Sequence, residues 1–526
     1  MTLISGFRVW VWFVLAGIGG APGTAAAQAD LNPVATTRAG KVRGYVDQGI
    51  KAFKGIPYGE DTARHRFQPP VPRAAWNGVR DALAFAPTAP QPAGRANGEN
   101  AAMSEDCLYL NVWTPALRDG ARRPVLVYFH GGGYSGGSVT ENLYDGTRLS
   151  RRGDAVVVTV NHRLNGFGYL YLAELGGPEF ADSGNAGMLD LVLALKWVRD
   201  NSAEFGGDPG NVTIFGQSGG GAKCATLMAM PAAQGLFHRV WTMSGQQLTG
   251  RTREHGTQTA RDVLRALELS PEKISEIKTM PVGKLIAAMR GGSWTPVTDG
   301  GALPRDPFSP EASPLSADIP MVMGNTHDET TNLIGGGDPA AFTLTWETLP
   351  GKLTQHVKQF MGEISAEAVV AEYRQLYPGY SASDVFFAAT TAARSWKGMV
   401  LQSERRARQG GAPTFVYCVN WPSPADGGKW KAPHTVDIPL VFDNVAHSQY
   451  TVGAADAQKV ADAMSEALLA FARTGNPNTR EIPAWPRFET GRRATMLFER
   501  ETRVENDPRG AERKLFAPAL YVQPGT

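Results

Sequence analysis

Short runs of consecutive apolar, mostly β-branched residues recur along the chain, separated by segments with helical spacing. The runs are residues 125–130, 155–161, 212–216, 240–244, 321–325 and 414–419. Consecutive apolar positions are typical of strands that are covered on both faces. Residues 188–204, 219–230 and 456–473 have helical spacing, and the last segment is followed by Gly475 and Pro477. Strands that alternate with helices predict an α/β fold with a mostly parallel central sheet and helices on both faces.

Two stretches lie outside this alternation. Residues 252–310 and 342–399 are rich in helical patterns and contain no matching strands. We expect them to be helical insertions over the sheet, where a substrate site could be built. Because the chain shows no internal repeat and no long linker, we expect residues 28–526 to form a single domain.

The first residues have the pattern of a targeting segment. Arg8 precedes an apolar stretch at 9–18, which is followed by small residues and by Ala25-Ala26-Ala27. A basic start, a short apolar core and a small-residue site are typical of a secretory signal peptide. We therefore predict a signal peptide at 1–27, cleaved after Ala27 or Ala29, and a secreted or periplasmic bacterial protein. A buried N-terminal helix is the less favoured alternative, and no later stretch has the length of a membrane span.

Composition narrows the possible partners. The chain carries 52 Lys and Arg against 50 Asp and Glu, with no basic block. We therefore expect no nucleic-acid partner. Its three cysteines in 526 residues cannot form a disulfide framework. The sequence gives no indication of oligomeric state.

A candidate nucleophile lies at the end of one predicted strand. Gly216-Gln217-Ser218-Gly219-Gly220 follows the run at 212–216 and precedes a predicted helix. G-x-S-x-G in this strand–turn–helix setting exposes the serine hydroxyl on a tight turn. The alternative is an ordinary serine in a βα turn. We predict that Ser218 is the nucleophile.

A second glycine-rich segment, His130-Gly131-Gly132-Gly133, closes the run at 125–130. Runs of this kind supply backbone N–H groups to an oxyanion, together with the residue after the nucleophile. We therefore predict Gly132, Gly133 and Gly219 as oxyanion donors. A phosphate-binding loop is the competing interpretation, but no GK[ST] or G-x-G-x-x-G occurs in a βα setting.

These motifs lie within longer blocks that resemble one family. Residues 205–220 resemble the serine signature of the type-B carboxylesterases, and residues 105–113 (EDCLYLNVW) resemble the second signature of that family. Shorter similar blocks are 53–58, 161–165 and 184–190. The family includes bacterial para-nitrobenzyl esterases and animal cholinesterases, and the likeness runs from about Thr37 to Tyr521. It implies an α/β-hydrolase fold, cleavage of small-molecule carboxylic esters, and no cofactor; no segment has metal-ligand spacing.

The resemblance also indicates an acid and a base. Glu329 matches the acid position of the family, with the neighbouring Asp328 as its rival. His434 matches the base position, and His447 is its competitor. In this scheme His434 takes the proton of Ser218 and later returns it to the leaving alcohol, while Glu329 orients the imidazole.

Further residues match family positions around these three. Ser244 and Asp437 are expected close to the acid and the base. His130 and His162 are expected to bond to the backbone at strand ends. Cys107 lies where the family has a bridged cysteine, but Ala89 stands at the expected partner position, so Cys107 is predicted to be a buried free thiol, and Cys224 and Cys418 small core residues.

Departures from the family pattern bear on the substrate. Gln217 replaces the glutamate that many members have before the nucleophile, and residues 93–103 lack the choline-stacking tryptophan of cholinesterases. We therefore expect neutral or anionic esters rather than choline esters. Some bacterial members remove polycarboxylate side chains from fumonisins, and the predicted signal peptide and the arginine-rich insertions are compatible with that substrate. The alternatives left open are an amidase or lactonase using the same three residues, and a non-catalytic binding module.

Overall fold

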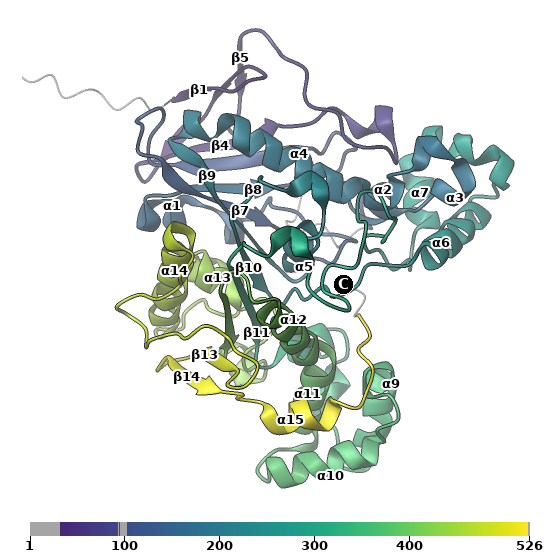
Figure 1. Cartoon of the computed structure of the whole chain (residues 1–526), viewed down its shortest axis with the longest axis vertical. Coiled ribbons are helices and arrows are strands. Elements are labelled where there is room, and N and C mark those ends of the chain that lie inside the picture. Colours follow the sequence, from purple (N-terminus) through teal and green to yellow (C-terminus); the bar gives the residue numbers. More distant parts are fainter. Residues whose placement is uncertain (1–31, 93, 95–101, 524–526) are drawn as a thin grey trace, which may run out of the picture. The chain divides into compact units, whose positions relative to one another are not determined.

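The computed structural model describes residues 32–92, 94 and 102–523, and the predicted signal peptide at 1–27 lies outside this part (Figure 1). An 11-stranded sheet forms its centre, in the order β14-β13-β12-β11-β10-β9-β7-β8-β6-β4-β3. Its strands are β3 (Tyr45–Asp47), β4 (Ile50–Pro57), β6 (Tyr109–Thr114), β7 (Arg123–Phe129), β8 (Val156–Val160), β9 (Gly207–Gln217), β10 (Arg239–Met243), β11 (Met321–Thr326), β12 (Thr414–Val419), β13 (Ala494–Phe498) and β14 (Arg503–Asn506). A separate 3-stranded sheet consists of β1 (Val34–Thr36), β2 (Lys41–Arg43) and β5 (Val79–Asp81).

The centre of the large sheet is parallel. Neighbouring strands from β13 to β8 all pair in parallel, whereas β14 at one edge and β6, β4 and β3 at the other pair antiparallel. Each apolar run listed in the sequence is a strand of the parallel part, so the prediction of a mostly parallel sheet is confirmed. From β7 the chain continues to β8 on one side and then to β9 on the other. Such a reversal of direction places a crevice at the carboxyl ends of the strands.

Helices cover both faces of this sheet. They are α1 (Thr147–Gly153), α2 (Asn165–Tyr169), α3 (Ala173–Gly176), α4 (Ala186–Asn201), α5 (Gly219–Leu227), α6 (Arg253–Ala266), α7 (Val282–Ala288), α8 (Glu329–Leu333), α9 (Leu349–Met361), α10 (Ala366–Leu376), α11 (Ala382–Thr391), a π-helical turn η10 (Ala392–Trp396), α12 (Lys397–Gln409), α13 (Asp437–Val441), α14 (Ala457–Thr474) and α15 (Gly510–Phe516). The three helices predicted from spacing correspond to α4, α5 and α14. Among the described residues, no helix combines the length and the apolar character that crossing a bilayer requires.

Alternate residues of one strand belong to different cores. Val125, Val127 and Phe129 of β7 pack in a cluster with residues of α4 and α5. Leu126 and Tyr128 pack in a second cluster with residues of α13 and α14. Because a strand turns successive side chains to opposite faces, a run without polar residues is what two covered faces require.

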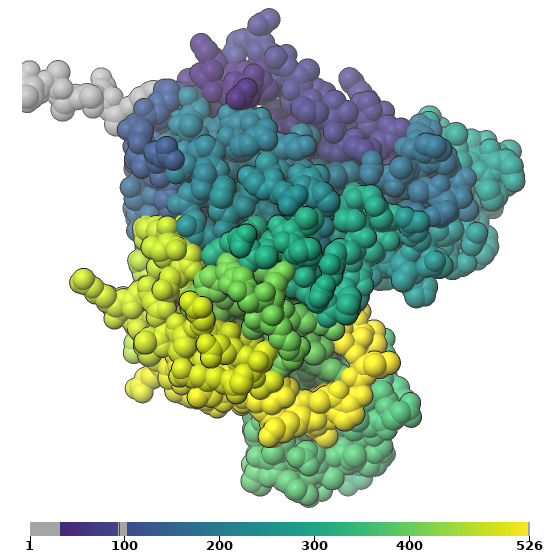
Figure 2. Space-filling model, viewed as in Figure 1, coloured from purple at the N-terminus to yellow at the C-terminus, as the bar shows by residue number. Residues whose placement is uncertain are grey.

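The insertion at residues 342–399 has a hydrophobic cluster of its own. Residues of α9, α10 and α11 form it, and Phe516 of α15 packs into it. Figure 2 shows the yellow C-terminal segment against the green surface of these helices. The insertion is anchored beside the sheet where Thr390 and Thr391 meet the Thr330 hydroxyl, at 2.7 and 2.9 Å.

All three cysteines are free and buried, which confirms the prediction for Cys107, Cys224 and Cys418. Ala89, at the position where the family has a partner cysteine, is fully buried. Burial raises the pKa of the Cys107 thiol well above its usual value. Cys107 is therefore a neutral packing residue and not a reactive thiol.

Candidate active site

The predicted site residues follow the carboxyl ends of five adjacent parallel strands. In sheet order they are His434 after β12, Glu329 after β11, Ser244 after β10, Ser218 after β9, and Gly131–Gly133 after β7. Parallel strands bring their carboxyl ends to the same edge of the sheet. Residues that are up to 303 positions apart in the sequence are thereby gathered at one edge.

Ser218 occupies a strained turn between β9 and α5. Its φ and ψ are 56° and −126°, a conformation that side-chain-bearing residues rarely adopt. The turn is held by a hydrogen bond of 2.7 Å from the Ser218 N–H to the Met243 carbonyl. A Cβ added to Gly220 would lie 1.9 Å from the Phe129 carbonyl oxygen. Glycine is therefore required here for the turn to pack against β7, and Ser218 stays partly exposed.

The predicted oxyanion donors lie against this turn. Gly132 and Gly133 have φ of +82° and +65°, which favours glycine at both positions. A Cβ on Gly219 would lie 2.1 Å from the Gly133 carbonyl oxygen, so the two backbones are in contact. The N–H groups of Gly132, Gly133 and Gly219 donate no hydrogen bond within the described chain. Free N–H groups next to a serine are suited to bind developing negative charge.

Glu329 is fully buried and accepts hydrogen bonds at both carboxylate oxygens. Its Oε1 accepts from the Ser244 hydroxyl at 2.5 Å, the Thr326 N–H at 2.8 Å and the Asn325 amide at 3.0 Å. Its Oε2 is paired with Nδ1 of His434. Burial alone would raise its pKa, but the His434 charge and these hydrogen bonds lower the pKa below the usual value. Glu329 is therefore held as a carboxylate.

The rivals of these two residues lie elsewhere. The Asp328 carboxylate pairs with His327 at 3.1 Å and accepts from the Ala432 N–H at 3.2 Å, and in the described chain it forms no hydrogen bond or ion pair with His434. His447 ends a short 3₁₀ turn and is exposed. Within the described residues, it is Glu329 that pairs with the predicted base.

His434 is buried beside Glu329, on a loop clamped to α8. The Asn332 amide donates to the His434 carbonyl at 3.2 Å. The Gln217 amide nitrogen lies 3.4 and 3.3 Å from Nδ1 and Nε2 of the imidazole, so it contacts both ring nitrogens almost equally. In the part of the chain described, no hydrogen bond joins His434 to the Ser218 hydroxyl. The structure thus brings His434 into contact with both Glu329 and Gln217, and Ser218 is the residue that follows Gln217 in the chain.

Asp437, which the sequence places near the acid and base, is fully buried on α13. Neither of its carboxyl oxygens has a hydrogen-bond partner in the described chain. Burial and the nearby charge of Glu329 raise its pKa well above the usual value, so the group is neutral. Asp437 is close enough to Glu329 for the charge of Glu329 to act on it, but no hydrogen bond joins the two side chains in the described chain.

Sequence reasoning missed a buried cationic group beneath the oxyanion loop. The Lys223 ammonium on α5 donates to the His130 carbonyl at 3.0 Å, and burial lowers the Lys223 pKa to about 7. Nδ1 of His130 contacts the Gly131 carbonyl at 2.9 Å, as expected. His162 lies against His130, with ring centroids 4.6 Å apart and ring planes inclined by 32°. Its ring interacts with the Val160 backbone, which opposes the lowering of the His162 pKa by burial, although neither ring nitrogen meets the geometry of a hydrogen bond in the described chain. The only sequence signal for this group is that Lys223 is the single charged residue in a helix of mostly small and apolar residues.

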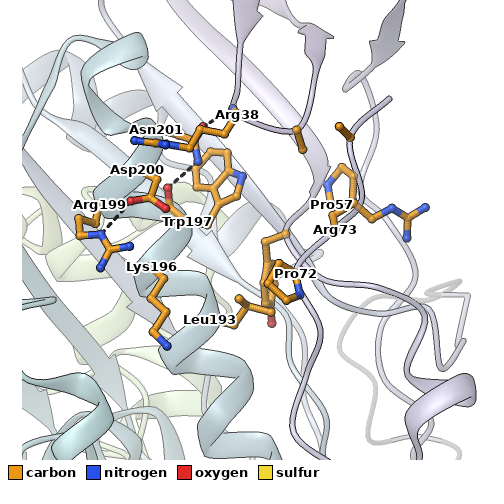
Figure 3. Close-up of a pocket in the computed structure, with 13 residues that line it drawn as sticks. Arg38, Pro57, Pro72, Arg73, Leu193, Lys196, Trp197, Arg199, Asp200 and Asn201 are labelled. Atoms are coloured by element: carbon orange, nitrogen blue, oxygen red, sulfur yellow. Dashed lines mark hydrogen bonds and ion pairs between the residues drawn. The ribbon is translucent and has the colours of Figure 1, made fainter. Parts of the chain in front are cut away.

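Two of the cavities of the described structure have neither Glu329 nor His434 in their lining. One, of about 490 Å³, is lined by Ser135 beside the oxyanion loop and by Met289, Arg290 and Trp294 of the first insertion. The other, of about 390 Å³, lies along α4 and contains none of the predicted site residues (Figure 3). Within the residues described, no group of three His, Cys, Asp or Glu side chains could hold a metal ion.

Comparisons with known proteins identify the family of the chain and agree with its fold. A sequence model described as the carboxylesterase family matches residues 31–516. The para-nitrobenzyl esterase of Bacillus subtilis (strain 168) is 33% identical over 504 residues, which cover 92% of this chain and 99% of that protein. The fumonisin B1 esterase of Sphingopyxis macrogoltabida is 32% identical, with 91% and 88% covered. Among solved structures, carboxylesterase EST55 of Geobacillus stearothermophilus aligns with a TM-score of 0.81 and 35% identity, over 92% of this chain and 99% of that one.

Proposed function

The chain belongs to the carboxylesterase family and has the α/β-hydrolase fold, and on that premise we propose that it hydrolyses carboxylic esters through an acyl-enzyme formed on Ser218. The observation that carries this proposal is the Glu329–His434 pair, buried beside the strained Ser218 turn. A carboxylate that holds an imidazole next to a serine is the arrangement that activates a serine nucleophile.

In the proposed reaction His434 accepts the Ser218 proton as the hydroxyl attacks the ester carbonyl. The N–H groups of Gly132, Gly133 and Gly219 stabilise the oxyanion of the tetrahedral intermediate. His434 then gives the proton to the leaving alcohol, and a water molecule releases the acyl group by the same steps. Glu329 stays ionised throughout and stabilises the imidazolium, because its four donors favour the charged form.

We further propose that the substrates are neutral or anionic esters. Gln217 leaves the imidazole without an acidic neighbour at that position, so no fixed negative charge there repels a carboxylate. The similarity to a fumonisin B1 esterase supports esters of polycarboxylic acids as one such class. The signal-peptide pattern at 1–27 supports a secreted or periplasmic location.

Replacing Ser218 with Ala tests the mechanism. We expect kcat/KM for a simple butyrate ester to fall at least about a thousandfold while the melting temperature stays within a few degrees. A fluorophosphonate should label the wild-type protein once, at Ser218. Cys224→Ala is the matched control, because Cys224 is a second nucleophilic residue type, on the helix that follows Ser218, and this variant should label normally. Labelling of Ser218→Ala, or an adduct mapped to another residue, would refute the assignment.

A further inference from the structure

Arg394 is a charged side chain at the edge of the site with no charged partner. It lies in the π-helical turn η10 and is only partly exposed. In the described chain its guanidinium forms neither a hydrogen bond nor an ion pair. By contrast, two arginines of α12 are engaged: Arg405 donates to the Phe308 carbonyl at 2.5 Å and Arg408 pairs with Glu404 at 2.7 Å.

The position of Arg394 follows from the residues on the same face of its helix. One turn before it, Thr390 and Thr391 contact Thr330, the residue after Glu329. One turn after it, Gly398 packs closely against Gln246 and Tyr521. A Cβ added to Gly398 would lie 2.8 Å from the Gln246 side chain and 2.7 Å from the Tyr521 hydroxyl. This face therefore runs along the segments that follow β11 and β10, with Arg394 between them.

Electrostatics agree with this placement. Burial lowers the pKa of Arg394, and the charge of Glu329 opposes that effect, so the two groups lie within range of each other. An arginine remains charged despite such a shift. Glu329 forms no direct ion pair with Arg394 in the described chain, and its oxygens accept hydrogen bonds from His434, Ser244, Asn325 and Thr326.

Other polar atoms on this face also lack partners. The Gln246 carbonyl oxygen Oε1 and the Gln402 amide nitrogen Nε2 are buried and unbonded in the described chain. Leaving a guanidinium and further buried polar groups unpaired is costly, and such groups persist where function needs them. π-Helical turns are likewise frequent at functional sites.

We propose that Arg394 binds a free carboxylate carried by the substrate in addition to the scissile ester. The inference rests on the proposed function and adds a substrate class to it: half-esters of dicarboxylic or polycarboxylic acids, or esters of hydroxy acids. A planar guanidinium matches a carboxylate with two parallel hydrogen bonds, and a partly desolvated one pairs more strongly than a surface group.

Two pairs of esters separate charge from shape. In the acyl pair, monoethyl glutarate is compared with ethyl 4-carbamoylbutanoate, which replaces the carboxylate with a neutral amide of the same size. In the alcohol pair, 3-butyryloxypropanoate is compared with 3-butyryloxypropanamide. The measured quantity is the ratio of kcat/KM for the anionic ester to that for its amide.

In the wild-type protein we expect this ratio to exceed one for at least one pair, and Arg394→Gln to lower it by about tenfold or more. Arg394→Lys, which keeps the charge but not the fork, should give an intermediate ratio. Arg405→Gln is the matched control, because it removes the same charge from the same helix, and its ratio should equal that of the wild-type protein. The pair that responds tells whether the carboxylate belongs to the acyl or the alcohol part.

Three outcomes would overturn the inference. An unchanged ratio in Arg394→Gln, with both esters slowed equally, would mean that Arg394 only supports Glu329. An equal fall of this ratio in Arg405→Gln would indicate a nonspecific electrostatic effect of removing a positive charge. If the Arg394 variants do not fold, competitive inhibition of the wild-type protein decides: glutarate should inhibit and glutaramide should not, and equal effects refute the proposal. Failure of the proposed function is distinguishable, since all four esters and the fluorophosphonate would then be inert.

Discussion

The two sides of Ser218 are built in opposite ways. On the side of β11 and β12, Glu329 and His434 are fixed by hydrogen bonds, and both oxygens of the carboxylate are used. On the side of β7, Gly132 and Gly133 are fixed by shape, and their N–H groups are left free. The first side is defined by the charge it holds, and the second by the side chains it lacks. Substitutions that change only charge should therefore act on the first side, and an added methyl group on the second.

The largest effect is expected from Glu329→Gln. This change keeps the size of the side chain but removes the charge that stabilises the imidazolium, and the amide can orient the ring wrongly. We expect kcat/KM to fall about a thousandfold or more. Asp328→Asn is the matched control, because its carboxylate is bonded to His327 and Ala432 rather than to His434, and it should retain activity within a few fold. Steady-state kinetics on a neutral butyrate ester checks both, and similar losses in the two variants would contradict the assignment of the acid.

Gly132→Ala probes the other side. A Cβ at Gly132 would lie 2.3 Å from the Gly136 carbonyl oxygen, and φ of +82° is unfavourable for alanine. The loop must move, which displaces the oxyanion donors, so we expect kcat to fall about a hundredfold. Gly235→Ala separates strain from displacement, since Gly235 has φ of +72° with open space around it. That control should lose stability and keep kcat. Full activity in Gly132→Ala would mean that this loop does not hold the oxyanion.

The same contrast explains what the sequence could predict. Six strands of the parallel part were predicted because both faces are buried, which leaves continuous apolar runs such as 156–160. The seventh, β13, was not predicted, although all its residues are buried. The antiparallel edge was not, because a strand such as Arg503–Asn506 is short, polar and partly exposed. Glu329 and His434 were found from family motifs, and the order of strands explains why such distant residues meet.

The sequence could not predict those residues whose role depends on their surroundings in the folded protein. Lys223 and Arg394 are single charged residues in helices, and no spacing rule tells that one lies under the oxyanion loop and the other beside Glu329. Asp437 was predicted near the pair, but its neutral state follows from burial in three dimensions.

Lys223→Met tests the charged group beneath the oxyanion loop through the pH dependence of the free energy of unfolding. Lysine in an unfolded chain has a pKa near about 10.4, whereas burial lowers that of Lys223 to about 7. Between these values the unfolded state binds more protons than the folded state, so this group makes stability rise with pH across that window. Below about pH 7 both states are protonated, and its contribution no longer changes with pH. Chemical denaturation from pH 6 to pH 10 should show a rise in the free energy of unfolding that is smaller in Lys223→Met. Parallel curves for the two proteins would contradict this assignment.

The smallest effect is expected where the two sides meet, at Gln217. Its amide contacts the imidazole at 3.3 Å, and its Oε1 lies 3.3 Å from where a Cβ on Gly131 would stand. Gln217→Glu would place a carboxylate against His434 without changing size, which favours the protonated imidazole and moves the acid side of the pH–activity profile upward. At an effective dielectric constant of about 20, a unit charge about 4 Å from a substrate carboxylate contributes about 4 kcal/mol before desolvation and screening reduce it. We therefore expect the ratio of kcat/KM for monoethyl glutarate to that for its amide to fall about threefold to tenfold. The ratio of kcat/KM for choline butyrate to that for 3,3-dimethylbutyl butyrate should rise.

Gln217→Met controls for the lost amide contact and should move the pH–activity profile without changing either ratio. If the wild-type protein already prefers choline butyrate about tenfold over its uncharged isostere, the charge preference inferred for this site is wrong, whatever the variants show.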